Sequence, residues 1–339
     1  MNKYPTINYI GNKQKIVDWI IEKFPIKNGT VVDLFSGGAS VSYGLKKKGF
    51  RVLSNDFLYS NYVLAKALIE NSADILDFRK IEYKPKLSDI EKKYSEINFL
   101  SDVLYFDFEI KELAKLLLVS ENVKEYEKSI FLALLRRAMI RKIPYSRMNI
   151  RWDQIKKFRD EEYSYKKYKR RRAYHNKSFF YHIEDYLDQY NKAVFDNGKE
   201  NMAFQKDAYV FLEELNENVD LIYMDPPYPS TMNDYESFYG YFDQILGKKI
   251  ETYSKLTDKL TFMEEFEKLV KLACETSNFV ALSINNRAKP SYLEISKMVS
   301  KYGLVSIHEK NHVYKVTGKE NKNKSIEYLI VIDTKKIRS

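Results

Sequence analysis

The chain has 339 residues, enough for one large domain or two ordinary ones with a substantial hydrophobic core. With 44% hydrophobic and 31% charged residues, no run near about 18 apolar residues and no apolar signal core, we expect a globular cytoplasmic protein without a membrane segment. The net charge of +10 favours a polyanionic partner, while the lone Cys274 and four histidines without ligand spacing exclude an internal disulfide and predict no bound metal.

The first part of the chain is typical of a nucleotide-binding half-unit. Residues 8–13 precede an amphipathic helix predicted over residues 16–24. Residues 30–35 form a short apolar strand that runs into a glycine turn at residues 36–40 and then a helix ending at Gly49. Because this turn has neither the G-x-G-x-x-G fingerprint nor a phosphate-loop lysine, it favours a nucleoside without phosphates over NAD or ATP.

A second predicted strand, residues 51–54, ends in Asn55 and Asp56. Asp56 lies 23 residues after Asp33, close to the distance of about 20 at which an acid binds ribose hydroxyls in such folds. The two acids and the glycine turn between them therefore predict a ligand site.

The alternation of strands and helices disappears from about residue 75 to residue 196, where helical patterns such as 110–118 and 130–140 take over. Within this part, residues 136–177 contain 16 Lys and Arg against 4 Asp and Glu, whereas the rest of the chain has 41 basic and 43 acidic residues. Aromatic residues interleave with this basic segment. Since basic side chains bind phosphates without reading sequence, the segment predicts nucleic-acid binding.

The alternation returns with a strand at residues 202–205, followed by Asp207, and with another strand that leads into Asp225-Pro226-Pro227-Tyr228. The two prolines lack an N–H and fix φ, so the strand stops there and the backbone is stiff. A carboxyl group, main-chain carbonyls and an aromatic ring thus stand at the carboxyl end of a parallel strand, where open α/β sheets bind ligands. This set suits an exocyclic amine on a flat base.

Residues 230–241 are predicted to form a polar, aromatic loop long enough to cover that site. A helix at residues 261–276 and a strand at residues 279–284 follow. The tail alternates in a strand-like way at residues 308–316 and 325–332, which predicts a terminal hairpin.

Taken together, these segments resemble the Dam-like, α-group DNA adenine-N6 methyltransferases. Residues 8–13, 33–38, 55–56 and 225–228 carry the likeness in the family's order, and Asp207 adds to it. The resemblance implies an α/β fold with a Rossmann-like, seven-stranded, mostly parallel sheet and a C-terminal reversed hairpin. It also implies an inserted helical target-recognition domain, so we expect a methyltransferase domain at residues 1–75 and 196–339 and a helical, basic domain at 76–195.

The resemblance further implies S-adenosyl-L-methionine as cofactor, with Asp56 at its ribose hydroxyls and Asp207 and Ala208 at its adenine. The implied cofactor-binding residues are Tyr9, Lys13, Asp33, Phe35, Ser36, Gly37, Asp56, Asp207, Ala208 and Asp225. The implied catalytic residues are Asp225, Pro226, Pro227 and Tyr228. Asn12 departs from the family pattern, in which a second glycine is common at this place.

Duplex DNA is the expected partner, together with a cognate restriction endonuclease unless the protein is a stand-alone regulator. We assign DNA contacts to the basic segment and to the predicted loop. The residues so assigned are Arg147, Asn149, Arg151, Lys169, Arg170, Arg171, Arg172, Asn233 and Tyr235.

The expected reaction is direct methyl transfer to N6 of a flipped-out adenine. The Asp225 carboxylate and the Pro226 carbonyl accept the two N6 hydrogens, and the base stacks on Tyr228. Three alternatives stay open: a cytosine-N4 methyltransferase, in which the first motif residue is more often Ser, an RNA adenine methyltransferase, and a non-catalytic DNA-binding protein with the same fold.

Overall fold

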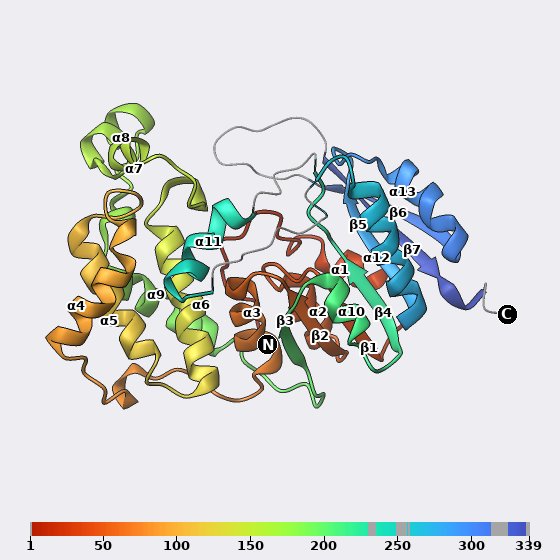
Figure 1. Cartoon of the computed structure of the whole chain (residues 1–339), viewed down its shortest axis with the longest axis horizontal. Helices are drawn as coiled ribbons and strands as arrows, with labels where there is room; N and C mark the ends of the chain where they lie inside the picture. The colour runs from red at the N-terminus through yellow and green to blue at the C-terminus, as the bar shows by residue number, and fades with distance from the viewer. Residues whose placement is uncertain (1, 230–234, 249–255, 257, 313–324, 337–339) are drawn as a thin grey trace. The chain divides into compact units, whose positions relative to one another are not determined.

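The computed structural model of the protein describes residues 2–229, 235–248, 256, 258–312 and 325–336 (Figure 1). The chain divides into two compact units. The helical unit comprises Met1–Ile10, Lys66–Asp196 and Tyr235–Lys249, and the sheet unit comprises Gly11–Ala65, Asn197–Asp234 and Ile250–Ser339.

A seven-stranded sheet in the order β3-β2-β1-β4-β5-β7-β6 forms the centre of the sheet unit (Figure 1). The strands from β3 to β5 are parallel to their neighbours, whereas β7 is antiparallel to both β5 and β6. This confirms the predicted mostly parallel sheet with a reversed C-terminal pair. The strands are β1 (Thr30–Asp33), β2 (Arg51–Asp56), β3 (Met202–Gln205), β4 (Val219–Met224), β5 (Ser277–Asn285), β6 (Leu304–His312) and β7 (Ser325–Asp333).

Two groups of helices cover this sheet because successive side chains of a strand point to opposite faces. Val32, Ile222 and Val280 belong to a core shared with α10, α12 and α13. Tyr223, the neighbour of Ile222 in β4, points to the opposite face of the sheet. Its ring lies 6.1 Å from that of Phe24, which comes just after α1. The helices are α1 (Val17–Glu22), α2 (Ser40–Lys47), α3 (Tyr59–Ala65), α10 (Ala208–Glu213), α12 (Phe262–Thr276) and α13 (Tyr292–Val299).

The helical unit is built around α6, which is buried on nearly all sides. Residues from Ser129 to Ile140 are all buried, as expected for the central helix of a bundle rather than an amphipathic surface helix. The helices of this unit are α4 (Leu87–Ile97), α5 (Asp107–Ser120), α6 (Glu125–Arg141), α7 (Trp152–Arg159), α8 (Glu161–Tyr168), α9 (Phe179–Asn191) and α11 (Tyr235–Ile245), with a π-helical turn at Lys66–Glu70.

The unit boundaries differ from the split predicted from sequence. The prediction placed residues 1–10 and 235–249 with the sheet, but the structure groups them with the helices. The backbone N–H of Ile10 donates to the Tyr239 hydroxyl of α11 at 2.9 Å, and Arg137 Nε of α6 donates to the Thr6 carbonyl at 2.8 Å. These hydrogen bonds attach both segments to the helical unit. Sequence periodicity could not predict them, because they join residues that are far apart in the chain.

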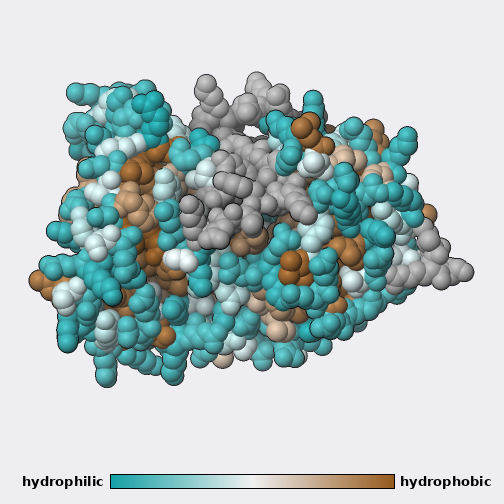
Figure 2. All heavy atoms as spheres, viewed as in Figure 1, coloured by the Kyte–Doolittle hydropathy of each residue, from teal (hydrophilic) through white to brown (hydrophobic). Residues whose placement is uncertain are grey.

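The face shown in Figure 2 is mostly hydrophilic, with hydrophobic side chains exposed in separate patches. Within the described residues, none of the helices is long and apolar enough to cross a membrane.

Candidate active site

Four of the predicted acids follow neighbouring parallel strands of the sheet unit. Asp33 ends β1, Asp56 ends β2, Asp207 follows β3 and Asp225 follows β4. The register pairs β1 with β2 and β4, and β2 with β3, so these strand ends meet at one edge of the sheet. The structure therefore brings together the acids that strand–helix alternation predicted.

Asp33 is buried beneath the turn that follows β1. Its Oδ2 accepts hydrogen bonds from Ser42 Oγ at 2.6 Å and from the Ser42 N–H at 3.1 Å. Among the described residues, Asp33 Oδ1 has no hydrogen-bond partner. Burial raises the pKa of Asp33 to about 7, with smaller contributions from the negative charges of Asp225 and Asp56. The described residues thus leave one oxygen of this carboxyl group without a hydrogen-bond donor.

The glycine turn is tied to the second strand. Gly37 has φ of 50°, and its N–H donates to Asp56 Oδ2 at 2.8 Å. Asp56 Oδ1 accepts from the Leu58 N–H at 2.9 Å and from Asn61 Nδ2 at 3.1 Å. Asp56, predicted at ribose hydroxyls, therefore also fixes the turn. Ser36 Oγ is buried and finds no hydrogen-bond partner in the described part of the chain.

Asn55 joins three strand ends, a role that sequence reasoning missed. Its Nδ2 donates to the carbonyls of Leu34 at 3.2 Å and Lys206 at 3.1 Å, and its Oδ1 accepts from the Lys206 N–H at 3.2 Å. In the sequence, the available signal was an Asn directly after the apolar residues of a predicted strand.

The other predicted cofactor residues have structural contacts of their own. Asp207 caps α10 by accepting from the Tyr209 N–H at 2.9 Å. Ala208 lies in the core of the sheet unit, and the partly buried Phe35 packs against that core.

Asp225 forms an ion-paired cluster with Lys13 and Glu327. Lys13 Nζ lies 3.2 Å from Asp225 Oδ2 and 2.7 Å from Glu327 Oε1. The Asp225 side chain is 24% exposed, whereas that of Glu327 is fully buried. Burial, opposed by Lys13, raises the pKa of Asp225 to about 6. Lys13, predicted as a cofactor-binding residue, thus lies beside Asp225. Sequence analysis missed Glu327, for which an acid within the apolar terminal strand was the available signal.

Tyr228 differs from its predicted use as an open stacking surface. Its side chain is only 3% exposed, and its hydroxyl donates to the Ser283 carbonyl at 3.0 Å. Its ring lies 5.7 Å from that of Phe262 and 6.2 Å from that of Phe266. Pro226 is buried and Pro227 half-buried, so the turn after Asp225 is anchored in the core.

Tyr9 belongs to the helical unit. Its ring stacks on that of Tyr239 at 5.2 Å, and the guanidinium of Arg136 lies 4.6 Å from the Tyr239 ring centre. Arg136 is 3% exposed, and its Nε and Nη2 have no hydrogen-bond partner among the described residues. Tyr9, predicted at the cofactor, is thus held in a cation–aromatic cluster of this unit.

A sequence model of the D12 class N6 adenine-specific DNA methyltransferases matches residues 9–279. The chain belongs to this family. It acts on DNA, and the cytosine-N4, RNA and non-catalytic alternatives give way to an adenine-specific DNA methyltransferase.

The methyltransferase is also similar to individual proteins. It is 43% identical to Type II methyltransferase M2.HphI of Haemophilus parahaemolyticus over 344 residues, which cover 98% of this chain and 99% of that protein. It is 25% identical to Type II methyltransferase M.FokI of Planomicrobium okeanokoites over 361 residues, 94% of this chain and 50% of that protein. A stretch of 96 residues, 27% of the chain, is 33% identical to modification methylase LlaI of Lactococcus lactis subsp. lactis, covering 14% of that protein.

The basic segment of the methyltransferase presents less charge to solvent than its composition predicts. Arg136, Arg137, Lys142 and Arg159 are buried in the helical unit. The predicted DNA contacts Arg151, Lys169, Arg170 and Arg171 are exposed, whereas Arg172 is half-buried with its guanidinium 4.8 Å from the Phe158 ring. The exposed members remain suited to phosphate contacts.

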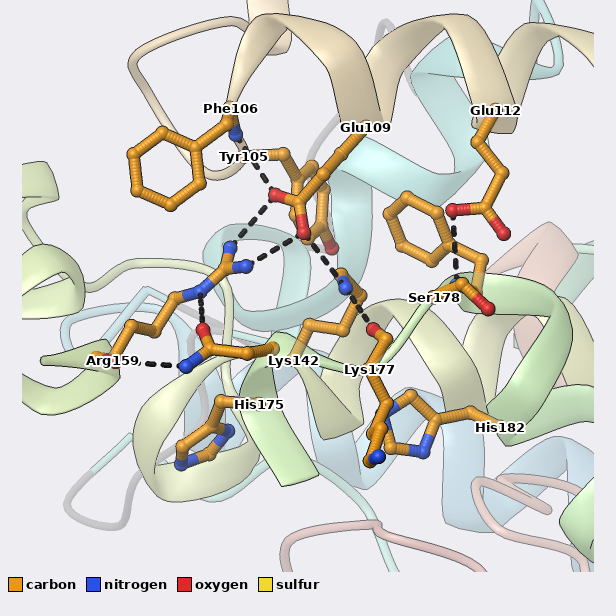
Figure 3. A network of polar contacts seen from close by, with 12 residues as sticks. Tyr105, Phe106, Glu109, Glu112, Lys142, Arg159, His175, Lys177, Ser178 and His182 are labelled. Atoms are coloured by element: carbon orange, nitrogen blue, oxygen red, sulfur yellow. Dashed lines mark hydrogen bonds and ion pairs between the residues drawn. The ribbon is translucent and has the colours of Figure 1, made fainter. Parts of the chain in front are cut away.

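Figure 3 shows the polar contacts of two of these buried cations, Arg159 and Lys142. Glu109 of α5 accepts from Arg159 Nη1 at 2.7 Å and from Arg159 Nη2 at 2.6 Å, and its Oε1 lies 2.7 Å from Lys142 Nζ. Lys142 also donates to the Lys177 carbonyl. Burial alone would raise the pKa of Glu109, but Arg159 and Lys142 hold this pKa below its usual value. The network therefore attaches the basic segment to α5.

The prediction of a loop over residues 230–241 is wrong for residues 235–241, which belong to helix α11. Phe238 and Phe242 are four positions apart and both buried, the spacing of one helical face. Asn233 lies outside the described residues, as does the side chain of Tyr235.

Two other predicted DNA contacts adjoin this helix. Asn149 Nδ2 donates to Ser237 Oγ at 3.2 Å, and the Arg147 guanidinium lies 5.7 Å from the Phe238 ring. The side chains of Asn149 and Arg147 are therefore in contact with α11.

Among the described residues, no group of three or more His, Cys, Asp or Glu side chains is arranged to hold a metal ion.

Proposed function

We propose that this methyltransferase transfers a methyl group from S-adenosylmethionine to N6 of a flipped-out adenine in duplex DNA. The observation that carries the proposal is the position of Asp225, a partly exposed carboxyl group at the end of β4, beside the acids that end β1 and β2. In open α/β sheets, ligands bind at this edge.

The residues around the glycine turn suit S-adenosylmethionine. Asp33 Oδ1 and Ser36 Oγ are buried without partners among the described residues, and a buried polar atom without a partner costs about 1–3 kcal/mol. The ammonium and hydroxyl groups of S-adenosylmethionine would satisfy such atoms. We propose that Asp33, Ser36, Gly37 and Asp56 hold the cofactor, with Phe35, Asp207 and Ala208 beside it. When bound, S-adenosylmethionine supplies an electrophilic methyl group on a sulfonium.

Asp225 and Pro226 receive the target amine. The Asp225 side chain is partly exposed, and a pKa of about 6 leaves its carboxylate largely ionised at neutral pH. The carboxylate and the Pro226 carbonyl accept the two N6 hydrogens. Acceptors fixed in this way favour a more nucleophilic nitrogen and stabilise the positive charge that develops on it.

The target base must leave the duplex to reach this carboxylate, at a cost of a few kcal/mol. Stacking on Tyr228, predicted from sequence, requires an exposed ring face, whereas Tyr228 is only 3% exposed. We propose instead that Tyr228 anchors the turn through the Ser283 carbonyl and so fixes the backbone of Pro226 and Pro227.

Duplex DNA would be held by the exposed basic residues of the helical unit, including Arg151, Lys169, Arg170 and Arg171, and by Arg147, Asn149 and Arg172 nearby. Two similar proteins are named Type II methyltransferases and another a modification methylase. We therefore propose that this enzyme works with a cognate restriction endonuclease. From the composition of the sequence we also propose that it is cytoplasmic and needs no metal ion.

The decisive experiment compares Asp225→Ala and Asp225→Asn with Asp18→Asn, a change at a 93% exposed acid of the same unit. We expect both Asp225 variants to fold and to bind S-adenosylmethionine while methyl transfer to plasmid DNA is lost. Mass spectrometry of nucleosides from the wild-type reaction should show N6-methyladenine. Undiminished transfer by Asp225→Ala would refute the proposal, as would N4-methylcytosine as the only product.

A further inference from the structure

Glu327 occupies an unusual place for a carboxyl group. It lies within β7 and opposite Asn285 of β5, and its side chain is fully buried. Glu327 Oε1 accepts hydrogen bonds from Lys13 Nζ at 2.7 Å and from Ser283 Oγ at 2.8 Å. Its other oxygen, Oε2, has no partner in the described part of the chain. Such a group costs free energy, so its presence calls for a role beyond packing.

One ammonium group serves two carboxyl groups in this cluster. The side chain of Lys13 is only 9% exposed, and its Nζ lies closer to Glu327 Oε1 than to Asp225 Oδ2, at 2.7 Å against 3.2 Å. Ser283 gives Glu327 a second donor and so fixes its oxygen in place. The shorter contact of Lys13 is therefore with the buried acid of the sheet and not with the acid that faces the substrate.

We propose that Glu327 is a positioning residue of the transfer site: it retains the Lys13 ammonium and thereby leaves the Asp225 carboxylate available to the target amino group. The inference rests on the proposed function of Asp225. Without the charge of Glu327, Lys13 would pair fully with Asp225 and occupy the oxygen that has to accept an N6 hydrogen.

The charges around Asp225 fix the direction of the effect. The titratable groups that interact with it electrostatically are Lys13, Glu327, Asp33, Tyr223 and Tyr228. After burial, which is the largest influence and raises the pKa of Asp225, Lys13 lowers this pKa and Glu327 raises it. Neutralising Glu327 should therefore lower the pKa of Asp225, and removing Lys13 should raise it.

The test uses the full chain with Glu327→Gln, Lys13→Met and the double variant. Glu309→Gln is the matched control, because Glu309 is an exposed acid on the adjacent strand β6. For Glu327→Gln we expect kcat/KM for DNA to fall about tenfold while the affinity for S-adenosylmethionine stays within about twofold. The acid limb of its pH profile should move down from about pH 6 by about half a unit or more.

The double variant separates positioning from a merely structural role. Because Lys13 is then absent, it cannot close on Asp225, so Glu327→Gln with Lys13→Met should be more active than Glu327→Gln alone. The proposal would be overturned if the losses of kcat/KM in the two single variants add up in the double variant. It would also be overturned if the acid limb of the pH profile does not move in Glu327→Gln. If Glu327→Gln fails to fold, Lys13→Met alone should move the acid limb to higher pH, and an unmoved limb would equally overturn it.

A second readout does not depend on turnover. The pKa of Asp225 can be measured by NMR in protein labelled with carbon-13 at the aspartate carboxyl groups, with the signal assigned from Asp225→Asn. It should fall in Glu327→Gln, rise in Lys13→Met and stay unchanged in Glu309→Gln. If the wild-type protein transfers no methyl group but these shifts occur, the proposed function fails while the role of Glu327 in positioning Lys13 stands.

Discussion

The N–H of Gly37 donates a 2.8 Å hydrogen bond to Oδ2 of Asp56, so the acid that ends β2 holds the turn that follows β1. Gly37 is in the left-handed region at φ of 50°, which disfavours residues with a side chain. The shape of the turn therefore depends on a residue 19 positions further along the chain.

The first prediction concerns this bond. Asp56→Ala should weaken binding of S-adenosylmethionine by about 10- to 100-fold, because hydrogen bonds to a charged group contribute about 1.5–3 kcal/mol. Asp56→Asn should lose less, since its amide oxygen can still accept from Gly37. Isothermal titration calorimetry of both variants beside Asp18→Asn measures the effect, and equal affinities for wild type and Asp56→Ala would contradict it.

The second prediction is a pH dependence of stability at Asp33. Its pKa is about 7 in the folded protein against 3.8 for an ordinary Asp, so between these values the unfolded chain ionises while the native state keeps its proton. Wild-type stability should fall as the pH rises through this range, by about 4 kcal/mol in total. Asp33→Asn lacks this loss, so its stability relative to wild type should improve between pH 4.5 and pH 8 in urea unfolding. A difference that is constant with pH would show that Asp33 ionises normally.

The third prediction concerns the exposed bases. Replacing both Lys169 and Arg170 by Ala should weaken DNA binding and reduce the slope of log affinity against log salt by about 0.9 for each phosphate that is no longer neutralised. Fluorescence anisotropy at several salt concentrations measures this slope. The same double change at Lys271 and Lys297, which lie on α12 and α13 of the sheet unit, is the control. An identical slope in wild type and the first variant would place the DNA elsewhere.

The fourth prediction tests the network of Figure 3. Glu109→Gln leaves the buried cations Arg159 and Lys142 without their carboxylate and should cost about 3–5 kcal/mol of unfolding free energy. Glu162→Gln is the matched control. Glu162 is 65% exposed and pairs with Arg171 at 3.4 Å, so its loss should cost at most about 1 kcal/mol. Equal stabilities of the two variants in urea unfolding would mean that the network contributes nothing.

The parts of the site that could be predicted from the sequence are those that follow from the alternation of strands and helices along the chain. Asp33, Asp56 and Asp225 each follow an apolar strand, and the parallel register brings such strand ends together. The partnership of Lys13 with Glu327 could not be predicted this way, since the two residues are 314 positions apart and β7 meets β5 only in the folded sheet. Pairing across a sheet depends on topology, which local patterns do not encode.

The errors in the helical unit have a related cause. A count of charges treats every Arg and Lys as exposed, but Glu109 and aromatic rings bury several of them. The aromatic residues after Tyr235 were predicted to form a loop because their polar neighbours obscured the four-residue spacing of Phe238 and Phe242.

The helical unit is assembled from three separate stretches of the chain, of which the first and last are short. If this unit holds the DNA, as proposed above, an engineer who grafts a relative's DNA preference onto the enzyme would have to transplant all three stretches. Exchanging residues 66–196 alone would pair a foreign α6 with the native Tyr9 and Tyr239, whose rings contact Arg136 of the native α6. Chimaeras that carry the N-terminal ten residues and α11 along with the large insert should fold more often than those that do not.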